Sequence, residues 1–129
     1  MVRLLAGVSS RKSCRQLFKD LNILTMASLH ILEVTCFIRK YCKFLEQNTQ
    51  VHQHDTRSKL DIHVKMKKKQ KKKKKRKYIK KSVINMGTKI YNKLPRFLKE
   101  IDDHRAFWKK LKLFLLLQSF YSVEEFVST

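Results

Sequence analysis

Two adjacent carboxylates, Asp102 and Asp103, are the residues whose type and spacing most directly suggest catalysis. Neighbouring aspartates can hold two metal ions for nucleotidyl transfer. Such a pair is expected in a tight hairpin between apolar strands, whereas here His104 and Arg105 follow it at the start of a predicted helix. Because acidic side chains are favoured at helix N-termini, we interpret the pair as a helix cap.

Metal binding is a second possible chemistry, through His52, His54 and His63 with Asp55. No second cluster at a zinc-type spacing completes such a site, so we predict no metal. The sequence also has no glycine-rich phosphate loop, no calcium-binding loop and no set of nucleophile, base and orienting residue. It therefore predicts neither an active site nor a cofactor.

Three cysteines, Cys14, Cys36 and Cys42, are too few and odd in number for a disulfide framework. This count favours a reducing compartment. Basic neighbours on both sides of Cys14 could make its thiol reactive, but its helical register predicts a core residue first.

The strongest signal is a run of positive charge over residues 65–81, where 13 of 17 residues are Lys or Arg and none is acidic. Seven basic residues in a row, Lys71 to Lys77, fit a nucleic-acid-binding or nuclear-import patch. Like charges repel, so the segment should stay extended until phosphates or an acidic groove neutralise it. The predicted contact residues are Lys67, Lys68, Lys69, Lys71, Lys72, Lys73, Lys74, Lys75, Arg76, Lys77 and Tyr78.

Within this lysine run, Tyr78 is a candidate stacking partner for a base. Phosphate contacts carry no base information, so the predicted binding to RNA or DNA is non-specific. The alternative is a solvated low-complexity expansion without a selected role.

The composition points to one small helical domain. The 129 residues carry a net charge of +21, but the residues outside the run hold 18 basic and 10 acidic side chains, a net +8. An apolar fraction of 43% excludes wholesale disorder, and two Gly and one Pro argue against a sandwich or barrel. We expect an all-α fold, an irregular bundle of four to five helices with a disordered lysine-rich insert. The expected segments are residues 1–64, the linker 65–81, and residues 82–129.

The first helices are predicted from caps and apolar spacing. A short helix follows Ser13, whose spacing to Gln16 matches a capping box. Thr25 caps a long helix that runs to about Gln47, and residues 48–64 form a loop. The long helix has two apolar sets, both of which must be covered: Ile31, Val34, Phe37, Ile38, Tyr41, Phe44 and Leu45, and then Leu29, Leu32 and Cys36.

The later helices have clear boundaries. A helix spans Ser82 to Leu94 and is ended by Pro95, whose ring disfavours helical geometry at the preceding residue. A short turn of helix occupies residues 97–101. After Asp103, a last long helix places apolar residues on one side and lysines mostly on the other. Ser122 and Glu125 repeat the capping-box spacing, which predicts a terminal turn that buries Phe126.

The amino terminus resembles a targeting signal only in part. Apolar residues 4–8 are fewer than the roughly seven to fifteen that a secretion signal needs. Five basic residues before the first acid, Asp20, leave a mitochondrial presequence as an alternative, ranked behind a nuclear location. The longest apolar block, residues 111–120, is about half of the roughly twenty residues that span a bilayer, so no membrane helix or membrane partner is expected.

Four strings outside the lysine run occur in an order that points to a family. They are RKSCRQLFKDLNILT at residues 11–25 with SLHILE at 28–33, VHQHDTR at 51–57, GTKIYNKLP at 87–95, and FLL, SFYS and EF between residues 114 and 126. Together they resemble the region beyond the palm of jockey-type non-LTR retrotransposon reverse transcriptases. The resemblance covers nearly the whole chain outside the run.

The resemblance implies that the endonuclease, the fingers and the palm with its catalytic aspartates lie upstream in such proteins. This chain then looks like the C-terminal tail of an RNA-directed DNA polymerase from a mobile element, an orphan fragment that is catalytically silent by itself. The lysine run departs from the family pattern, which has a basic, partly apolar linker there, and is interpreted as an insertion or expansion.

The leading hypothesis is therefore a polymerase fragment that binds RNA or DNA non-specifically and salt-sensitively through the lysine run, in the nucleus. The alternative is a nuclear-targeted adaptor whose run is recognised by an import carrier. A cytoplasmic location is a further alternative to the nuclear one, and an enzyme is the third class considered.

Overall fold

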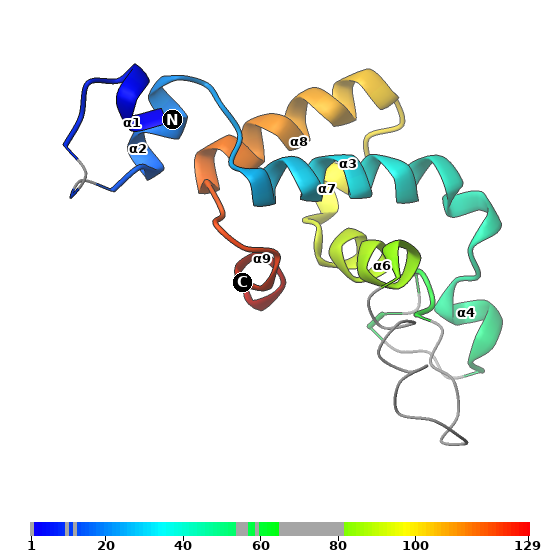
Figure 1. Ribbon diagram of the computed structural model, residues 1–129. Coiled ribbons are helices and arrows are strands. Elements are labelled where there is room, and N and C mark those ends of the chain that lie inside the picture. The colour runs from blue at the N-terminus through cyan, green and yellow to red at the C-terminus, as the bar shows by residue number, and fades with distance from the viewer. Residues whose placement is uncertain (1, 10, 12, 54–56, 59, 65–81) are drawn as a thin grey trace, which may run out of the picture. The chain divides into compact units, whose positions relative to one another are not determined.

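The computed structural model describes residues 2–9, 11, 13–53, 57–58, 60–64 and 82–129, and these are mostly helical (Figure 1). The predicted all-α class is confirmed. The helices are α1 (Val2–Leu5), α2 (Arg15–Asp20), α3 (Met26–Tyr41), the 3-10 helix η1 (Cys42–Phe44), α4 (Asn48–Val51), α6 (Val83–Lys93), α7 (Arg96–Lys99), α8 (His104–Gln118) and α9 (Val123–Ser128). None of these helices is long and apolar enough to cross a membrane.

The chain divides into two compact units. Unit 1 comprises Met1–Leu32 and Pro95–Thr129, and unit 2 comprises Glu33–Leu94. The first turns of α3 belong to unit 1 and the later turns belong to unit 2. Each unit contains fully buried apolar side chains, among them Leu111 in unit 1 and Ile90 in unit 2.

In unit 1, α8 supplies a stripe of buried side chains. Phe107, Leu111 and Leu115 recur every four residues and are fully buried, which confirms the predicted apolar face of this helix. Both α2 and α7 pack against α8. The ring of Phe97 on α7 meets that of Phe114 edge-on, with centroids 6.5 Å apart.

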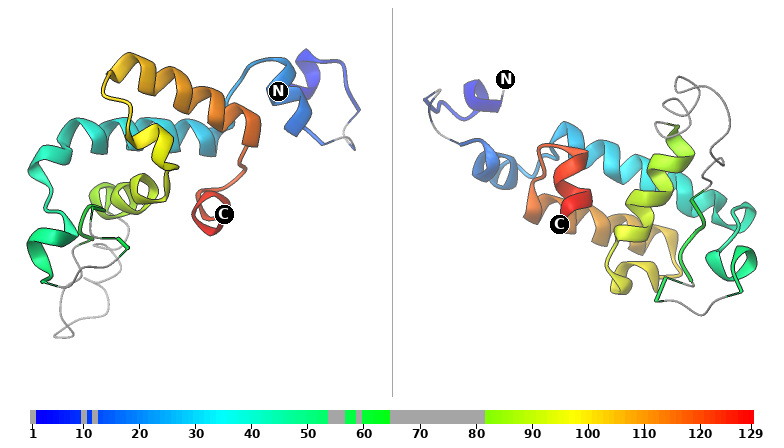
Figure 2. Two further views of the ribbon diagram at one scale, coloured as in Figure 1. Left: turned by 180° about the vertical axis from the view of Figure 1, so that it is seen from behind. Right: turned by 90° about the horizontal axis from the view of Figure 1, so that it is seen from below.

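The chain turns between α8 and α9 (Figure 2), and Ser119 is the C-cap residue of α8. This residue has a φ of 50°, the left-handed conformation that commonly ends a helix. Its hydroxyl donates to the carbonyl of Leu116 at 2.7 Å. The terminal helix then forms as predicted, with Phe126 buried and its ring perpendicular to that of Phe120 at a centroid distance of 5.3 Å.

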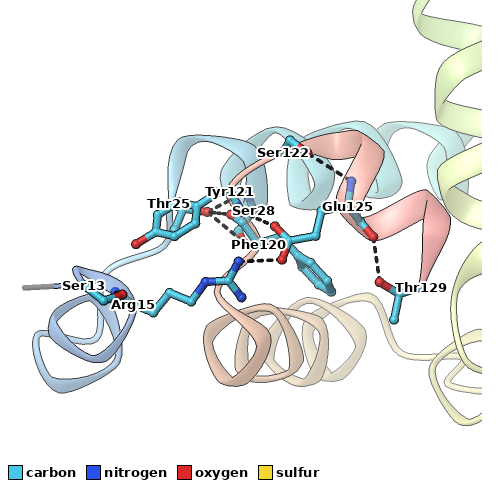
Figure 3. A network of polar contacts seen from close by, with 9 residues as sticks. All are labelled: Ser13, Arg15, Thr25, Ser28, Phe120, Tyr121, Ser122, Glu125 and Thr129. Carbon is cyan, nitrogen blue, oxygen red and sulfur yellow. Dashed lines mark hydrogen bonds and ion pairs between the residues drawn. The ribbon is translucent and has the colours of Figure 1, made fainter.

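Polar side chains hold α9 within unit 1 (Figure 3). Arg15 of α2 donates from Nη2 to Oε1 of Glu125 at 2.6 Å, and the other carboxylate oxygen accepts from the backbone N–H of Tyr121 at 2.9 Å. The Arg15 guanidinium also lies 4.8 Å from the centroid of the Tyr121 ring. Ser122 caps α9 by accepting from the Glu125 N–H at 3.0 Å.

A second polar contact in unit 1 joins the start of α3 to the segment after α8. Thr25 accepts from the backbone N–H of Ser28 at 3.1 Å, which confirms the predicted cap of α3. The same hydroxyl donates to the carbonyl of Phe120. One buried threonine therefore satisfies the first turn of α3 and fixes the residue that packs on Phe126.

In unit 2, α6 meets the second half of α3 at very close range. A Cβ added to Gly87 would lie 2.6 Å from Cγ1 of Ile38 and 2.7 Å from Cγ1 of Val34. Only glycine fits at such an approach without moving a β-branched side chain. The predicted boundaries of this helix are confirmed: Ser82 accepts from the Asn85 N–H at 3.3 Å, and the helix ends before Pro95.

Four local predictions are wrong. The sequence predicts a helix to about Gln47, but α3 ends at Tyr41 and the 3-10 helix η1 follows to Phe44. Beyond it the chain is extended: Gln47 pairs with Ile62 in an isolated β-bridge, and the Glu46 carbonyl accepts from the His63 N–H at 2.7 Å. The predicted loop contains a helical turn, α4, closed by a capping box of Gln47 and Gln50.

The capping box expected at Ser13 and Gln16 does not form, since Gln16 instead donates to Asp20 at 3.0 Å along α2. The expectation that both apolar sets of α3 are covered is also wrong. Ile31, Val34 and Ile38 are buried, but Phe37, Tyr41 and Phe44 face solvent.

Candidate nucleic-acid interface

The predicted contact residues of the lysine run lie outside the described residues. They are Lys67, Lys68, Lys69, Lys71, Lys72, Lys73, Lys74, Lys75, Arg76, Lys77 and Tyr78. The structure does describe the residues that flank the run, Ile62 to Val64 before it and Ser82 onward after it. Both flanks belong to unit 2.

The flank before the run is fixed by a side chain of α6. Asn92 makes a pair of hydrogen bonds with the backbone of Ile62: its Oδ1 accepts from the Ile62 N–H at 3.1 Å, and its Nδ2 donates to the Ile62 carbonyl at 2.9 Å. The side-chain amide thus makes the pair of hydrogen bonds that the backbone of a neighbouring β-strand would make. Ile62 is buried, so its backbone groups need these partners.

Asn48 holds the same flank from the other side. Its backbone N–H donates to the Asp61 carbonyl at 3.0 Å, and its side chain donates to the Ser58 carbonyl at 2.8 Å. Its Oδ1 lies 3.1 Å from Nδ1 of His63. The segment that precedes Lys65 is therefore held in place by specific hydrogen bonds.

The flank after the run is α6 itself, which begins at Val83, two residues beyond Lys81. Its Ile90 is fully buried, as is Leu98 of the following helix in unit 1. The same helix that carries the Asn92 side chain therefore receives the end of the run. The described residues on the two sides of residues 65–81 are thus Ile62, which is bonded to Asn92 of α6, and Ser82, which caps α6.

The proposed histidine cluster is only partly described. The rings of His52 and His63 lie edge to face with centroids 5.3 Å apart, while His54 and Asp55 lie outside the described residues. Within the part of the chain that the structure describes, no group of three or more His, Cys, Asp or Glu side chains could hold a metal ion.

The paired aspartates take the capping position that the sequence predicts. Asp103 precedes α8, and its Oδ2 accepts from the Ala106 N–H at 2.9 Å. Its carboxylate is thereby committed to the first turn of α8, where a negative charge also favours the helix dipole.

The cysteines are free thiols in the described residues, each of them half-buried. Cys14 stands at the N-cap of α2, not within its apolar face. Burial and the nearby Glu33 raise the pKa of the Cys36 thiol, and Arg39 opposes this shift in part. A raised pKa lowers the thiolate fraction at neutral pH, which makes Cys36 a poor nucleophile.

A smaller cationic surface lies on α8. Arg105, Lys109 and Lys110 are exposed, opposite the buried stripe of this helix, as its amphipathic pattern predicts. The amine of Lys112 lies 5.4 Å from the centroid of the Trp108 ring. These cations are spread over several turns, so the lysine run is by far the denser charge.

No protein-family model, curated protein or solved structure matches this chain.

Proposed function

We propose that this chain is the helical region beyond the palm of a jockey-type non-LTR retrotransposon reverse transcriptase, and that it binds RNA or DNA non-specifically through the lysine run. The family assignment rests on the order of the four strings between residues 11 and 126. By itself the chain carries no polymerase activity in this proposal, because Asp103 serves as a helix cap.

The observation that carries the binding proposal is the charge density of residues 65–81, with 13 cations and no acid. A strand of nucleic acid is the polyanion that such a segment neutralises best, since condensed counterions are released when phosphates are contacted. The anchored flanks support the proposal. Hydrogen bonds of Ile62 and Asn92 hold the unit from which the run emerges, so a bound strand would be tied to a folded support.

The test is the salt dependence of binding to a labelled single-stranded oligonucleotide of mixed sequence. If each of the seven cations from Lys71 to Lys77 contacts one phosphate, affinity should fall about a thousandfold between 50 and 200 mM salt, at a slope of about 0.7 per phosphate. Fluorescence anisotropy at four or five salt concentrations gives this slope directly.

The matched control replaces every Lys and Arg of residues 67–77 with Gln, which preserves the length of the segment. This variant should lose most of the slope and bind weakly at every salt concentration. Unchanged binding by the control, or a wild-type affinity that does not depend on salt, would contradict the proposal.

Nuclear import is the second candidate, favoured by the seven consecutive basic residues from Lys71 to Lys77. In this alternative an acidic groove of an import carrier recognises the run, and the helices serve as a scaffold. A fluorescent reporter fused to residues 71–77 should then accumulate in nuclei, and the same reporter with Gln at these positions should stay diffuse. A diffuse signal from both fusions would remove this candidate.

Catalysis is tested separately by primer extension with Mg²⁺ and a template strand. We expect no product from the purified chain. Extension that disappears in D103N would overturn the view of Asp103 as a cap alone.

A further inference from the structure

Three aromatic side chains at the end of α3 and in η1 face solvent. Phe37, Tyr41 and Phe44 follow the i, i+4, i+7 spacing of one helical face, and their exposed fractions are 44%, 41% and 83%. They belong to unit 2, together with Lys40 and Lys43 between them. These five residues are named the aromatic–lysine face.

The exposure of this face does not result from a rotation of α3 away from its packed orientation. Val34 and Ile38, which border the exposed rings within the same apolar stripe, are buried, and Gly87 of α6 fits closely against both. The rotation of α3 within unit 2 is therefore fixed by packing. Large rings left together in water mark a binding surface more often than an accident of folding.

The rings form a continuous surface. The centroids of Phe37 and Tyr41 are 4.7 Å apart with the planes tilted by 48°. Phe44 follows at the end of the 3-10 helix η1, directly after α3. Successive bases of a single strand stack on such platforms, and the contact tolerates any sequence because every base has a π-face.

The charges around the rings select the partner. Residues 33–46 contain Arg39, Lys40 and Lys43, and the two acidic side chains Glu33 and Glu46 stand at the ends of this stretch. The amine of Lys40 lies 5.8 Å from the centroid of the Tyr41 ring, and Lys43 is exposed beside Phe44. A protein-docking face would have few charges at its centre, whereas lysines interleaved with rings fit bases and phosphates together.

We propose that the aromatic–lysine face binds single-stranded RNA or DNA by stacking bases on Phe44, Tyr41 and Phe37 while Lys40 and Lys43 contact phosphates. The proposal rests on the nucleic-acid binding proposed above and adds a second, base-dependent contact to it. The proposed ligand is a single strand because the faces of the bases in a duplex are stacked on one another and cannot stack on the rings. The lysine run supplies charge, and this face supplies preference for unpaired strands.

The test compares F44A with the wild-type chain on three labelled oligonucleotides of equal length: a single strand, an abasic single strand and a duplex. Stacking is worth about 1–3 kcal/mol per base, so F44A should bind the single strand about 5- to 100-fold more weakly. Binding to the abasic strand and the duplex should not change. The salt slope should also stay the same, since no charge is removed.

Matched variants guard against a loss of fold. F44W should retain the affinity for single strands, because indole stacks as well as phenyl. F97A, which removes a half-exposed ring in unit 1, should leave all three affinities unchanged. Far-UV circular dichroism should show the helix content of the wild-type chain in each variant.

The outcomes separate this proposal from the one on which it rests. If F44A binds single strands normally but the variant with a Gln-substituted lysine run does not, the aromatic–lysine face has no role in binding. The proposal for the lysine run is then supported. If the variant with a Gln-substituted run keeps its affinity and salt slope while F44A loses its affinity for single strands, the proposal for the lysine run is contradicted. The proposal for the aromatic–lysine face is then supported. If F44A changes only the self-association of the chain in sedimentation, the face is a protein contact and the proposal is overturned.

Discussion

In unit 1 a partly exposed ion pair joins the terminal helix to α2, in addition to the buried ring of Phe126, whereas in unit 2 helix α6 packs on α3 through apolar groups at Gly87. The side chains of Arg15 and Glu125 are 44% and 34% exposed, so water and salt reach their ion pair. Gly87 meets Val34 and Ile38 in a buried contact that carries no charge. The first kind of anchor responds to pH and ionic strength, and the second does not.

This difference matters for the binding experiments. The lysine run and the aromatic–lysine face both belong to unit 2, where the anchors are packing and uncharged hydrogen bonds. A salt titration should therefore report the binding of a strand and not the loosening of the support. Three substitutions test the comparison, from the largest expected effect to the smallest.

The largest effect is expected for G87V in unit 2. The added side chain must displace Ile38 or Val34, and overpacking of this kind costs about 3 kcal/mol of the free energy of unfolding. Urea denaturation followed by circular dichroism measures it. K93V, an exposed position of the same helix, controls for the lower helix propensity of valine.

A double variant checks the cause. V34A removes part of the obstruction, so V34A combined with G87V should lose less stability than the sum of the two single variants. Strict additivity would mean that Gly87 is needed for some reason other than its approach to α3.

A smaller effect is expected for N92A, which removes two hydrogen bonds from the backbone of Ile62. Each is worth about 0.5–1.5 kcal/mol, so the variant should lose about 1–3 kcal/mol. The loss should be local: amide exchange at Ile62 should accelerate while that at Ile90 changes little. K93A is the neighbouring control, and equal acceleration at both amides would argue against an anchor at this point.

The smallest effect is expected for E125Q in unit 1, and it should depend on pH. The Tyr121 N–H and the Arg15 side chain lower the pKa of the Glu125 carboxyl from its ordinary value of 4.5. Its contribution to stability is therefore complete above about pH 4.5 and is lost as the pH falls through the lower, folded-state pKa.

The melting temperature of the wild-type chain should therefore exceed that of E125Q at pH 6. The two melting temperatures should converge as the pH falls to 3. E124Q, at the adjacent exposed carboxylate, should follow the wild-type curve. A constant difference between E125Q and wild type at every pH would show that the charge of Glu125 is irrelevant to its role.

Local sequence signals predicted the fold well wherever a boundary depends on neighbouring residues. Thr25, Asp103 and Ser122 cap their helices as expected, because each cap bonds within three residues of itself. The end of α3 was not predictable in this way. It depends on Gln47 meeting Ile62, a pairing that no periodicity within the helix can reveal.

The same limit applies to the polar anchors and to the candidate site. Arg15 and Glu125 are 110 positions apart in sequence, so nothing local connects them. The lysine run was evident from composition, but its anchor at Asn92 was not. Periodicity correctly placed Phe37, Tyr41 and Phe44 on one face of a helix, yet it could not tell whether anything covers that face.

The anchoring of both flanks on α6 has a consequence for how this region can change in evolution. Asn92 holds Ile62 and Ser82 caps the helix, and neither contact involves a residue of the segment 65–81. Loop-closure entropy grows only with the logarithm of length, and each doubling costs about 0.6 kcal/mol. Expansion or contraction of the lysine codons can therefore adjust the charge of the protein while leaving its helices in place.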